Sequence, residues 1–302
     1  MNRIKYHIPP KEILQTGGKP IYVFDLGHQN IDAKTVASFG DEWTTFFHFK
    51  EAEIVKIGDE YFDICQNIFT DKMQVLDAGC GTGRWSSYLA TRVAHIHAID
   101  PSDAVFSAAK LTANMPNITI TRCDIGSLPF PDSSFDLVMS IGVLHHIPNT
   151  AEAMKSVVAK LKTGGYALFY LYYNFDNKNW GYKFIGLTSI GLSKLIGRLP
   201  RRAKQFFSDV LALTLYLPFI SLARLLKFIM PKSNLYLKVP LSYYVNKSWT
   251  VIRNDSRDRF GTSLAQRFSK KQIHEMMKDA GLSDIVFSEK APYWHALGRK
   301  II

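Results

Sequence analysis

The sequence predicts an α/β fold built on a doubly wound parallel sheet with helices on both faces. Three observations predict it. Short apolar runs alternate with helical segments over residues 74–173, and a glycine-rich loop follows the first run. The alternation stops over residues 174–261 and resumes at Ser269. A chain of 302 residues exceeds one minimal α/β domain, so we expect a core of residues 74–173 and 262–302 that is interrupted by an insertion of residues 174–261.

Residues 1–73 are expected to form an N-terminal cap segment. Gly17-Gly18 predicts a turn, and Ile21–Leu26 predicts a short strand. The aromatic-rich segment Thr35–Phe47, which contains Trp43, predicts a helix. The sequence leaves open whether this helix covers a ligand or only packs on the core.

The stretch Gln74–Arg84 predicts a strand, a loop and the start of a helix. Its three glycines, Gly79, Gly81 and Gly83, stand at alternate positions. Glycines let the backbone take positive φ and let a ligand reach main-chain N–H groups. The spacing fits neither a Walker phosphate loop nor the dinucleotide pattern G-x-G-x-x-G, whose third glycine would fall on Arg84.

The remaining core elements follow in order. Asp284–Ser288 and Trp294–Arg299 close the chain without a long crossover, which indicates an antiparallel end to the sheet. Gly164-Gly165 is expected to end the helix Ala151–Leu161. The other expected strands are His95–Ile99, Ile118–Arg122, Phe135–Ile141 and Tyr166–Tyr173.

An aspartate lies at or near the end of each of three successive strands: Asp77, Asp100 and Asp124. In open α/β sheets, ligands bind beyond the carboxyl ends of the strands. Any one of these acids could be a helix cap or a surface charge. Three together favour a ligand site.

The pattern Asp-x-Gly-x-Gly-x-Gly after a hydrophobic pair resembles the first motif of the class I S-adenosylmethionine (SAM)-dependent methyltransferases, type 11 in particular. Leu128–Val138 and Val143–Ile147 are also similar to that family. The resemblance covers about residues 74–173 and 269–300. It implies a seven-stranded Rossmann-like sheet, with SAM as cofactor and S-adenosylhomocysteine as product.

The resemblance also implies roles for individual residues. Asp77 and Gly79 would lie beside the methionine part of SAM, Asp100 would accept the ribose hydroxyls, and Asp124 would accept the adenine amino group. The complete cofactor set is Asp77, Gly79, Cys80, Gly81, Gly83, Asp100, Pro101, Asp124, Ile125, Ser140 and Ile141.

His145 and His146 are the catalytic candidates, because a histidine titrates near neutral pH and can act as a general base. Structural support is the alternative role for this pair. The candidates for the acceptor side are Trp43, Tyr172, Tyr173, Asn174 and Arg259. Pairing of Arg259 with Asp255 or Asp258 is an equal alternative.

Residues 174–261 combine basic, aromatic and apolar side chains. Residues 181–240 hold ten Lys and Arg against one Asp, which is most of the net charge of +11. Val210–Ala223 carries no charge but is too short to span a bilayer and contains Pro218. We expect a helical insertion that is an acceptor lid, an anchor on an anionic membrane surface, or a basic collar for an acidic acceptor.

The three cysteines lack metal-ligand spacing and the N-terminus lacks a signal sequence, so we expect a cytoplasmic protein without a metal. If the insertion anchors it, the protein is membrane-peripheral. Motifs typical of methylation of nucleic-acid bases are missing, which favours a small-molecule or lipid-like acceptor over nucleic acid. The sequence predicts a biosynthetic SAM-dependent methyltransferase and leaves its oligomeric state open. The alternatives are a SAM enzyme that transfers no methyl group and a non-catalytic nucleotide-binding protein on a membrane.

Overall fold

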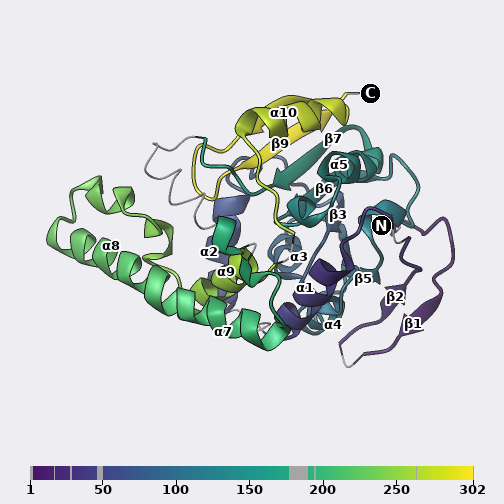
Figure 1. The fold of residues 1–302 in the computed structure, drawn as a ribbon. Helices are drawn as coiled ribbons and strands as arrows, with labels where there is room; N and C mark the ends of the chain where they lie inside the picture. The colour runs from purple at the N-terminus through teal and green to yellow at the C-terminus, as the bar shows by residue number, and fades with distance from the viewer. Residues whose placement is uncertain are drawn as a thin grey trace. The chain divides into compact units, whose positions relative to one another are not determined.

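The computed structural model describes residues 3–16, 18–27, 29–45, 50–176, 190–193, 195–262 and 264–301. Gly17 of the expected turn and Phe46-Phe47 of the expected helix lie outside these ranges. The chain forms two compact units. The first comprises Met1–Tyr173 and Gln266–Ile302, and the second comprises Asn174–Ala265 (Figure 1).

The first unit contains a mixed sheet of nine strands in the order β1-β2-β5-β4-β3-β6-β7-β9-β8. The predicted fold class is confirmed, but the predicted count of seven strands is wrong for the described chain, because β1 and β2 extend one edge of the sheet. The strands are β1 (Glu12–Leu14), β2 (Ile21–Val23), β3 (Gln74–Ala78), β4 (His95–Ile99), β5 (Ile118–Arg122), β6 (Phe135–Ile141), β7 (Leu161–Tyr170), β8 (Leu282–Phe287) and β9 (His295–Lys300).

Strand β3 lies at the centre of the sheet and pairs in parallel with β4 and with β6. The strand order therefore reverses beyond Ala78, which places the crevice of a doubly wound sheet at that end. Strand β9 runs antiparallel to β7 and β8, as the sequence predicts. The five residues of β3 are all buried, as expected for a strand that is covered on both faces.

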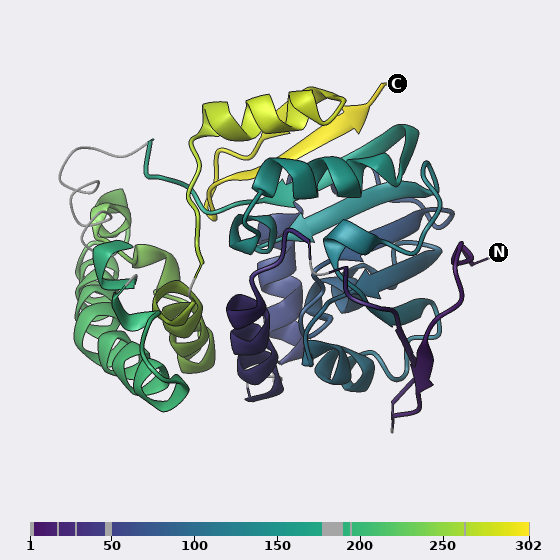
Figure 2. The same cartoon turned by 45° about the vertical axis from the view of Figure 1, so that its right-hand side comes forward.

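Helices cover both faces of this sheet (Figure 2). Met154 of α5 and Ile273 of α10 belong to the same hydrophobic cluster as Leu76 and Phe169 of the strands. On the opposite face, Ser86 of α3 donates a hydrogen bond to Asp77 of β3 (2.6 Å). The helices of this unit are α1 (Ala33–Thr45), α2 (Glu51–Tyr61), α3 (Arg84–Leu89), α4 (Ala104–Leu111), α5 (Thr150–Ala159) and α10 (Lys270–Asp279).

Two local features follow from their sequences. A capping box formed by Ser269 and Gln272 starts α10 at the point where the core pattern resumes. Gly164-Gly165 was expected to end a helix, and this was wrong. Helix α5 already ends at Ala159, and both glycines lie inside β7, where Gly164 takes φ +82°.

The second unit is mainly helical. Its elements among the described residues include α7 (Arg201–Leu211), a π-helical turn η3 (Ala212–Tyr216), α8 (Leu217–Ile229), the short 3-10 helices η4 (Asn234–Lys238) and η5 (Ser242–Tyr244), and α9 (Trp249–Gly261). The first three run on without a break and form one long helix (Figure 1). Tyr216, Ile220, Tyr244, Ile252 and Phe260 belong to its hydrophobic core.

The chain leaves the first unit and returns to it at neighbouring points. The backbone N–H of Phe268 donates to the carbonyl of Tyr172 (2.8 Å), and Tyr173 forms a parallel bridge with Phe268.

Candidate active site

The glycine loop after β3 is fixed by backbone hydrogen bonds to the end of β4. The N–H groups of Gly79 and Cys80 both donate to the carbonyl of Ile99 (2.8 Å each), and that of Gly81 donates to Asp100 Oδ2 (3.0 Å). Gly79 takes φ +86°, and a Cβ there would lie 2.5 Å from the side chain of Val143. Only glycine fits this position without rearrangement.

Asp77 lies buried at the floor of the loop. One carboxylate oxygen accepts the Ser86 hydroxyl, and the other, Oδ1, has no hydrogen-bond partner among the described residues. Burial raises the pKa of Asp77 to about 7, with Asp100 adding to the effect and Ser86 opposing it. A buried acceptor without a partner is costly unless a ligand supplies a donor, and an ammonium group would be the best one.

Asp100 and Asp124 differ in how many hydrogen bonds their carboxylates accept from the protein. Asp100 accepts from the N–H of Gly81 and from the N–H and hydroxyl of Ser102 (2.9 and 2.6 Å), and burial raises its pKa. Asp124 Oδ2 accepts the N–H of Gly27 (2.6 Å). Its Oδ1 is buried and has no partner in the described chain, so it can accept a further N–H donor.

The other residues of the expected cofactor set line the ends of the same strands. Ser140 is fully buried and donates its hydroxyl to the carbonyl of Ala78 (2.7 Å), which ties β6 to the loop. Ile125 is buried in the turn after β5, and the carbonyl of Pro101 accepts from Arg122 Nε (3.3 Å). The thiol of Cys80 is buried, and burial raises its pKa well above its usual value. It therefore stays protonated and is no nucleophile.

His145 and His146 lie in a short turn directly after β6. The side chain of His145 has 0% exposed surface, and neither ring nitrogen has a hydrogen-bond partner among the described residues. Its ring stacks on Tyr172 at 3.9 Å between centroids. Burial, together with the nearby His146 and Arg267, holds the pKa of His145 well below its usual value. The imidazole is therefore neutral at physiological pH.

An aromatic cluster surrounds this histidine pair. Ring centroids are 4.8 Å apart for Phe39 and His146, 6.0 Å for Tyr170 and Tyr172, and 5.0 Å for Tyr61 and Tyr170. The hydroxyl-bearing Tyr61 and Tyr170 are only half-buried. The aromatic cluster comprises Phe39, Tyr61, Trp85, His145, His146, Tyr170 and Tyr172.

The sequence did not single out Tyr61, Trp85 or Tyr170. Tyr170 precedes the candidate Tyr172 by two residues at the end of β7, and the period of a strand could have indicated it. Trp85 directly follows the glycine loop, where the Arg84 guanidinium lies 4.6 Å from its ring. Tyr61 lies in α2, which the sequence did not predict, and no motif includes it.

The acceptor-side candidates fall into both units. A Cβ on Gly81 would lie 3.6 Å from Trp43 Nε1, so Trp43 borders the glycine loop. Tyr172 is buried, and Tyr173 is half-buried. Asn174 and Arg259 belong to the second unit, where Arg259 forms an ion pair with Asp255 (3.3 Å). That pairing was the stated alternative to substrate binding.

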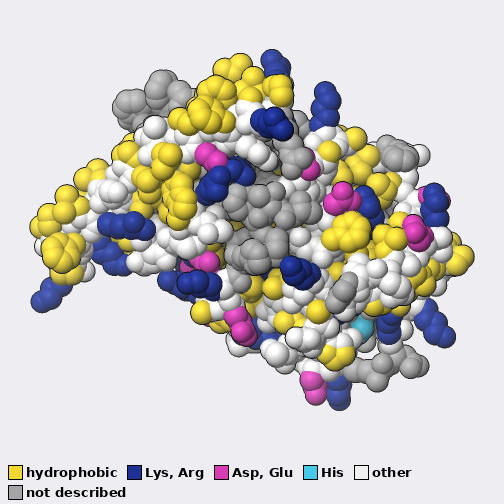
Figure 3. Space-filling model, turned by 90° about the horizontal axis from the view of Figure 1, so that it is seen from below, with side chains coloured by type: hydrophobic (Ala, Val, Ile, Leu, Met, Phe, Trp, Pro, Cys, Tyr) yellow, Lys and Arg dark blue, Asp and Glu magenta, His cyan; other side chains and the backbone are white. Residues whose placement is uncertain are grey.

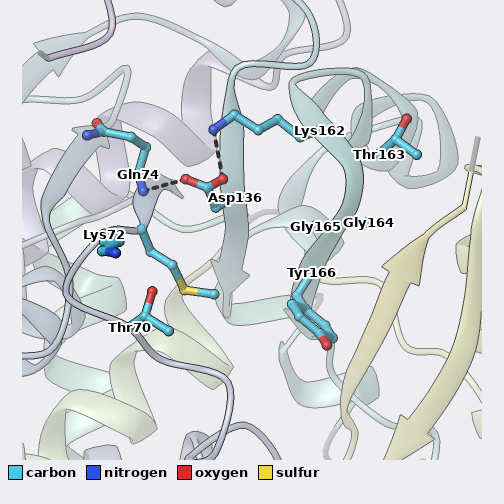
Figure 4. Close-up of a pocket in the computed structure, with 10 residues that line it drawn as sticks. Thr70, Lys72, Gln74, Asp136, Lys162, Thr163, Gly164, Gly165 and Tyr166 are labelled. Atoms are coloured by element: carbon cyan, nitrogen blue, oxygen red, sulfur yellow. Dashed lines mark hydrogen bonds and ion pairs between the residues drawn. The ribbon is translucent and has the colours of Figure 1, made fainter.

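A separate pocket lies at the opposite end of the central strands, at the amino ends of β3 and β6 (Figure 4). There Asp136 accepts the N–H of Gln74 (2.8 Å) and pairs with Lys162 (2.7 Å). This carboxylate is satisfied within the protein, in contrast to Asp77. Over the ranges that the structure describes, no group of three or more His, Cys, Asp or Glu side chains could hold a metal ion.

Comparisons with known proteins agree with this geometry. The family model described as "Methyltransferase domain" matches residues 76–169. The ubiquinone biosynthesis O-methyltransferase of Coxiella burnetii (strain RSA 331 / Henzerling II) is 30% identical over 188 residues, which cover 60% of this chain and 77% of that protein. Phthiotriol/phenolphthiotriol dimycocerosates methyltransferase 1 of Mycobacterium ulcerans is 34% identical over 99 residues, 32% of this chain and 36% of that protein.

Among solved structures, the YcgJ protein from Bacillus subtilis is similar with a TM-score of 0.45 and 16% identity, over 77% of this chain and 69% of that chain. That similarity is weak, so the family assignment rests on the sequence relatives. The glycine loop, the strand-end aspartates and these relatives lead to one conclusion: the chain belongs to the class I SAM-dependent methyltransferases.

Proposed function

We propose that this methyltransferase transfers the sulfonium methyl group of SAM to a hydroxyl group on an apolar, lipid-like acceptor. The observation that supports it most is the pair of buried carboxylate oxygens, Asp77 Oδ1 and Asp124 Oδ1, that have no partner in the described chain. SAM carries an ammonium group and an exocyclic amine, and these two donors match the two acceptors in chemistry.

The proposed cofactor contacts follow from the positions of the loop and the strand ends. Asp77 would hold the methionine ammonium, which restores the ionised form of this carboxyl group. Asp100 retains acceptor capacity for the ribose hydroxyls after its three hydrogen bonds within the protein. Asp124 would accept the adenine amino group beside the buried Ile125.

When bound, SAM supplies an activated methyl group. The protein has to hold the acceptor oxygen in line with that methyl group and exclude water from the site. Trp43 and Trp85 lie at the glycine loop, and Tyr170 lies beside Gly142, whose N–H donates to the Tyr170 carbonyl (3.1 Å). These aromatic walls support an apolar acceptor.

The names of two relatives point to the same class of acceptor. One is named for O-methylation in ubiquinone biosynthesis, and the other for methylation of phthiotriol and phenolphthiotriol dimycocerosates. We carry over only the shared feature, an apolar molecule, together with the O-methylation that the first name states.

We assign the general base to His145. Both ring nitrogens are buried without a partner in the described chain, so one of them can accept the proton of an acceptor hydroxyl. Burial holds the pKa of His145 well below its usual value, so the ring is neutral and a weaker base than an ordinary histidine. At saturating SAM, kcat should then persist as the pH falls through 6.5, where an ordinary histidine becomes protonated.

The test combines binding and turnover. Isothermal titration should show binding of SAM and no binding of NAD, and incubation with apolar phenols should yield S-adenosylhomocysteine and a methyl ether. His145→Gln should lower kcat by about 100-fold or more if His145 is the base. His95→Gln is the matched control, because His95 lies at the amino end of β4. Binding without any S-adenosylhomocysteine from the acceptor panel would contradict methyl transfer to this class.

We also propose a location for this protein and roles for its two flanking segments. The protein would lie in the cytoplasm at the surface of an anionic membrane. Residues 1–73 would cap the cofactor site, and residues 174–261 would form a lid over the acceptor. Gly27, Phe39 and Tyr61 support the first of the two roles, since each contacts a site residue in the core. Gel filtration would measure the oligomeric state, about which the sequence makes no prediction.

A further inference from the structure

The long helix of the second unit is the feature that the methyl-transfer site does not use. Within it, Arg202–Ile229 is the one helix among the described residues that is long and apolar enough, by length and composition, to cross a membrane. Its 28 residues correspond to about 42 Å at 1.5 Å per residue. The sequence had indicated that the uncharged run was too short and broken by Pro218. The helix instead continues through this proline, which stands at the start of α8 directly after the π turn.

The inner face of the long helix is packed on its own unit. Ser208, Ala212, Tyr216 and Ile220 are all buried at a spacing of four residues. In a regular α-helix each such step advances about 40° beyond a full turn, so this stripe would wind around the helix. The wider π turn at Ala212–Tyr216 compensates for part of that drift. One face is thus kept on its own unit along the helix: α7 and the π turn pack on α9, and α8 packs on Asn234–Lys238 and Ser242–Tyr244.

Polar contacts fasten this inner face. Asp209 accepts bidentate hydrogen bonds from Arg253 and from Arg257 of α9 (2.6–2.8 Å). Farther along, Tyr216 donates to Asp255 (3.0 Å), and Arg224 Nε donates to the carbonyl of Val245 (3.0 Å). A helix that crosses a bilayer alone would carry this charged cluster into hydrocarbon, at high cost. The contacts therefore favour a helix that lies flat on its unit.

The outer face of the long helix is apolar and exposed. Phe228 is 85% exposed and Phe206 is 63% exposed. Figure 3 shows hydrophobic side chains next to Lys and Arg side chains over its left-hand part, where α8 lies. The outer-face residues are Phe206, Phe207, Leu213, Leu222, Leu225, Phe228 and Ile229, all of them exposed.

The charge of this unit decides what can cover the outer face. Residues 174–265 hold fifteen Lys and Arg against four Asp and no Glu, a net charge of +11, so the rest of the chain is balanced. Two of the four acids, Asp209 and Asp255, are paired with arginines. A second copy would bring equal positive charge against this surface and would be repelled. An anionic lipid surface has the opposite charge and an apolar interior.

We propose that the second unit docks on an anionic bilayer with the long helix lying in the plane of the interface. Phe206, Leu213, Leu225 and Phe228 enter the acyl region, and the exposed cations Arg202, Lys232 and Lys238 contact lipid phosphates. This inference specifies the membrane location named above and does not depend on methyl transfer.

The first experiment measures cosedimentation of the full chain with vesicles. Binding to phosphatidylcholine vesicles that contain about 30 mol% phosphatidylglycerol is expected at low salt, and about 0.5 M NaCl should weaken it strongly. Phe228→Ser should weaken binding about tenfold or more. Lys232→Gln and Lys238→Gln should each weaken it about fivefold. Phe106→Ser, which removes an exposed phenylalanine from α4 of the first unit, should leave binding unchanged.

The second experiment locates the helix relative to the membrane. The three native cysteines are buried, so a Phe228→Cys variant can be labelled selectively with the environment-sensitive fluorophore NBD. Its emission should shift to the blue and become protected from aqueous quenchers on anionic vesicles, whereas the same label in Phe106→Cys should not respond. The bound protein should also be released by carbonate at high pH, since it does not span the bilayer.

Three results would overturn the proposal: equal binding to neutral vesicles, an NBD label at position 228 that stays in water, or extraction by detergent only, which would indicate a spanning helix. Concentration-dependent dimers in ultracentrifugation that Phe228→Ser abolishes would assign the outer face to a second copy instead. Titration of each variant with SAM keeps the two proposals separate, because the cofactor site should remain intact when vesicle binding fails.

Discussion

Two buried aspartates of the first unit and one half-buried aspartate of the second are used in opposite ways. In the first unit, Asp77 and Asp124 are buried, and each keeps one carboxylate oxygen without a partner in the described chain. In the second unit, Asp209 has both oxygens bound by Arg253 and Arg257. Burial alone would raise the pKa of Asp209, but these hydrogen bonds hold it below its usual value.

The difference separates acids that await a ligand from acids that stabilise the fold. A carboxylate with an unused buried oxygen lowers the stability of the protein alone and gains most when a cation binds. A carboxylate that two guanidinium groups already hold has nothing to gain from a ligand. In the two proposals above, the second unit binds through its surface and the first unit through its interior.

The largest expected effect is on cofactor affinity in Asp77→Asn. An amide cannot neutralise the methionine ammonium, and a hydrogen bond to a charged group contributes about 1.5–3 kcal/mol, so SAM should bind about 10- to 150-fold more weakly in isothermal titration. The fold should survive, because Asn can still accept the Ser86 hydroxyl. An unchanged affinity would show that Asp77 does not meet the ammonium.

The pH dependence of SAM binding tests the same contact between Asp77 and the ammonium group. Because the pKa of Asp77 is about 7, the carboxyl group is protonated at lower pH and must lose that proton to bind an ammonium. SAM affinity should fall by up to about tenfold per pH unit below pH 7, and this dependence should be missing in Asp77→Asn. Titrations in buffers of different ionisation enthalpy should detect the released proton.

The stability of the ligand-free protein should change with pH in the opposite direction from SAM affinity. The folded pKa of Asp77 is raised from 3.8 to about 7, so its contribution is fully present below pH 3.8 and is lost as the pH rises through 7. Asp77→Asn should therefore melt at a higher temperature than the wild type at pH 8 and gain less at pH 5. Equal gains at both pH values would contradict the raised pKa.

Asp209→Asn should lower the stability of the protein and leave SAM affinity unchanged, which is the reverse of what we expect for Asp77→Asn. It leaves two arginines without their common partner, and for a half-buried cluster the free energy of unfolding should fall by about 1–3 kcal/mol. Chemical denaturation followed by circular dichroism measures this loss. SAM affinity should stay within about twofold, and a large loss of affinity would mean that the two units do not divide their tasks in this way.

The smallest effect is expected at Asp132, an exposed carboxylate that pairs with Lys160 at 2.7 Å. Asp132→Asn should change the free energy of unfolding by less than about 0.5 kcal/mol and leave SAM binding intact. It therefore serves as the control for both preceding substitutions.

Much of the first unit could be predicted from the sequence because its signals are local. The glycine at position 79 is required because a Cβ there would clash with Val143. Asp77, Asp100 and Asp124 stand where apolar runs end. The aromatic cluster could not be predicted in the same way, since Tyr61 and Tyr170 are 109 positions apart and meet only through the fold. The free oxygens of Asp77 and Asp124 are likewise a property of packing.

The long helix escaped prediction for a different reason. Pro218 is expected to break a helix, yet the long helix continues through it. In a regular α-helix its ring would clash with the carbonyl of residue 214, and that residue lies in the wider π turn. Strand β1, with three residues, is too short to show a period.

The meeting of Phe268 with Tyr172 and Tyr173 has a consequence for how this chain can be divided. Since the two crossing points are hydrogen-bonded to each other, a short turn could replace the whole helical unit while the order of the strands stays as it is. The sheet of the first unit is then separable from the inserted segment, and a chain rejoined at these two points should keep its strand order.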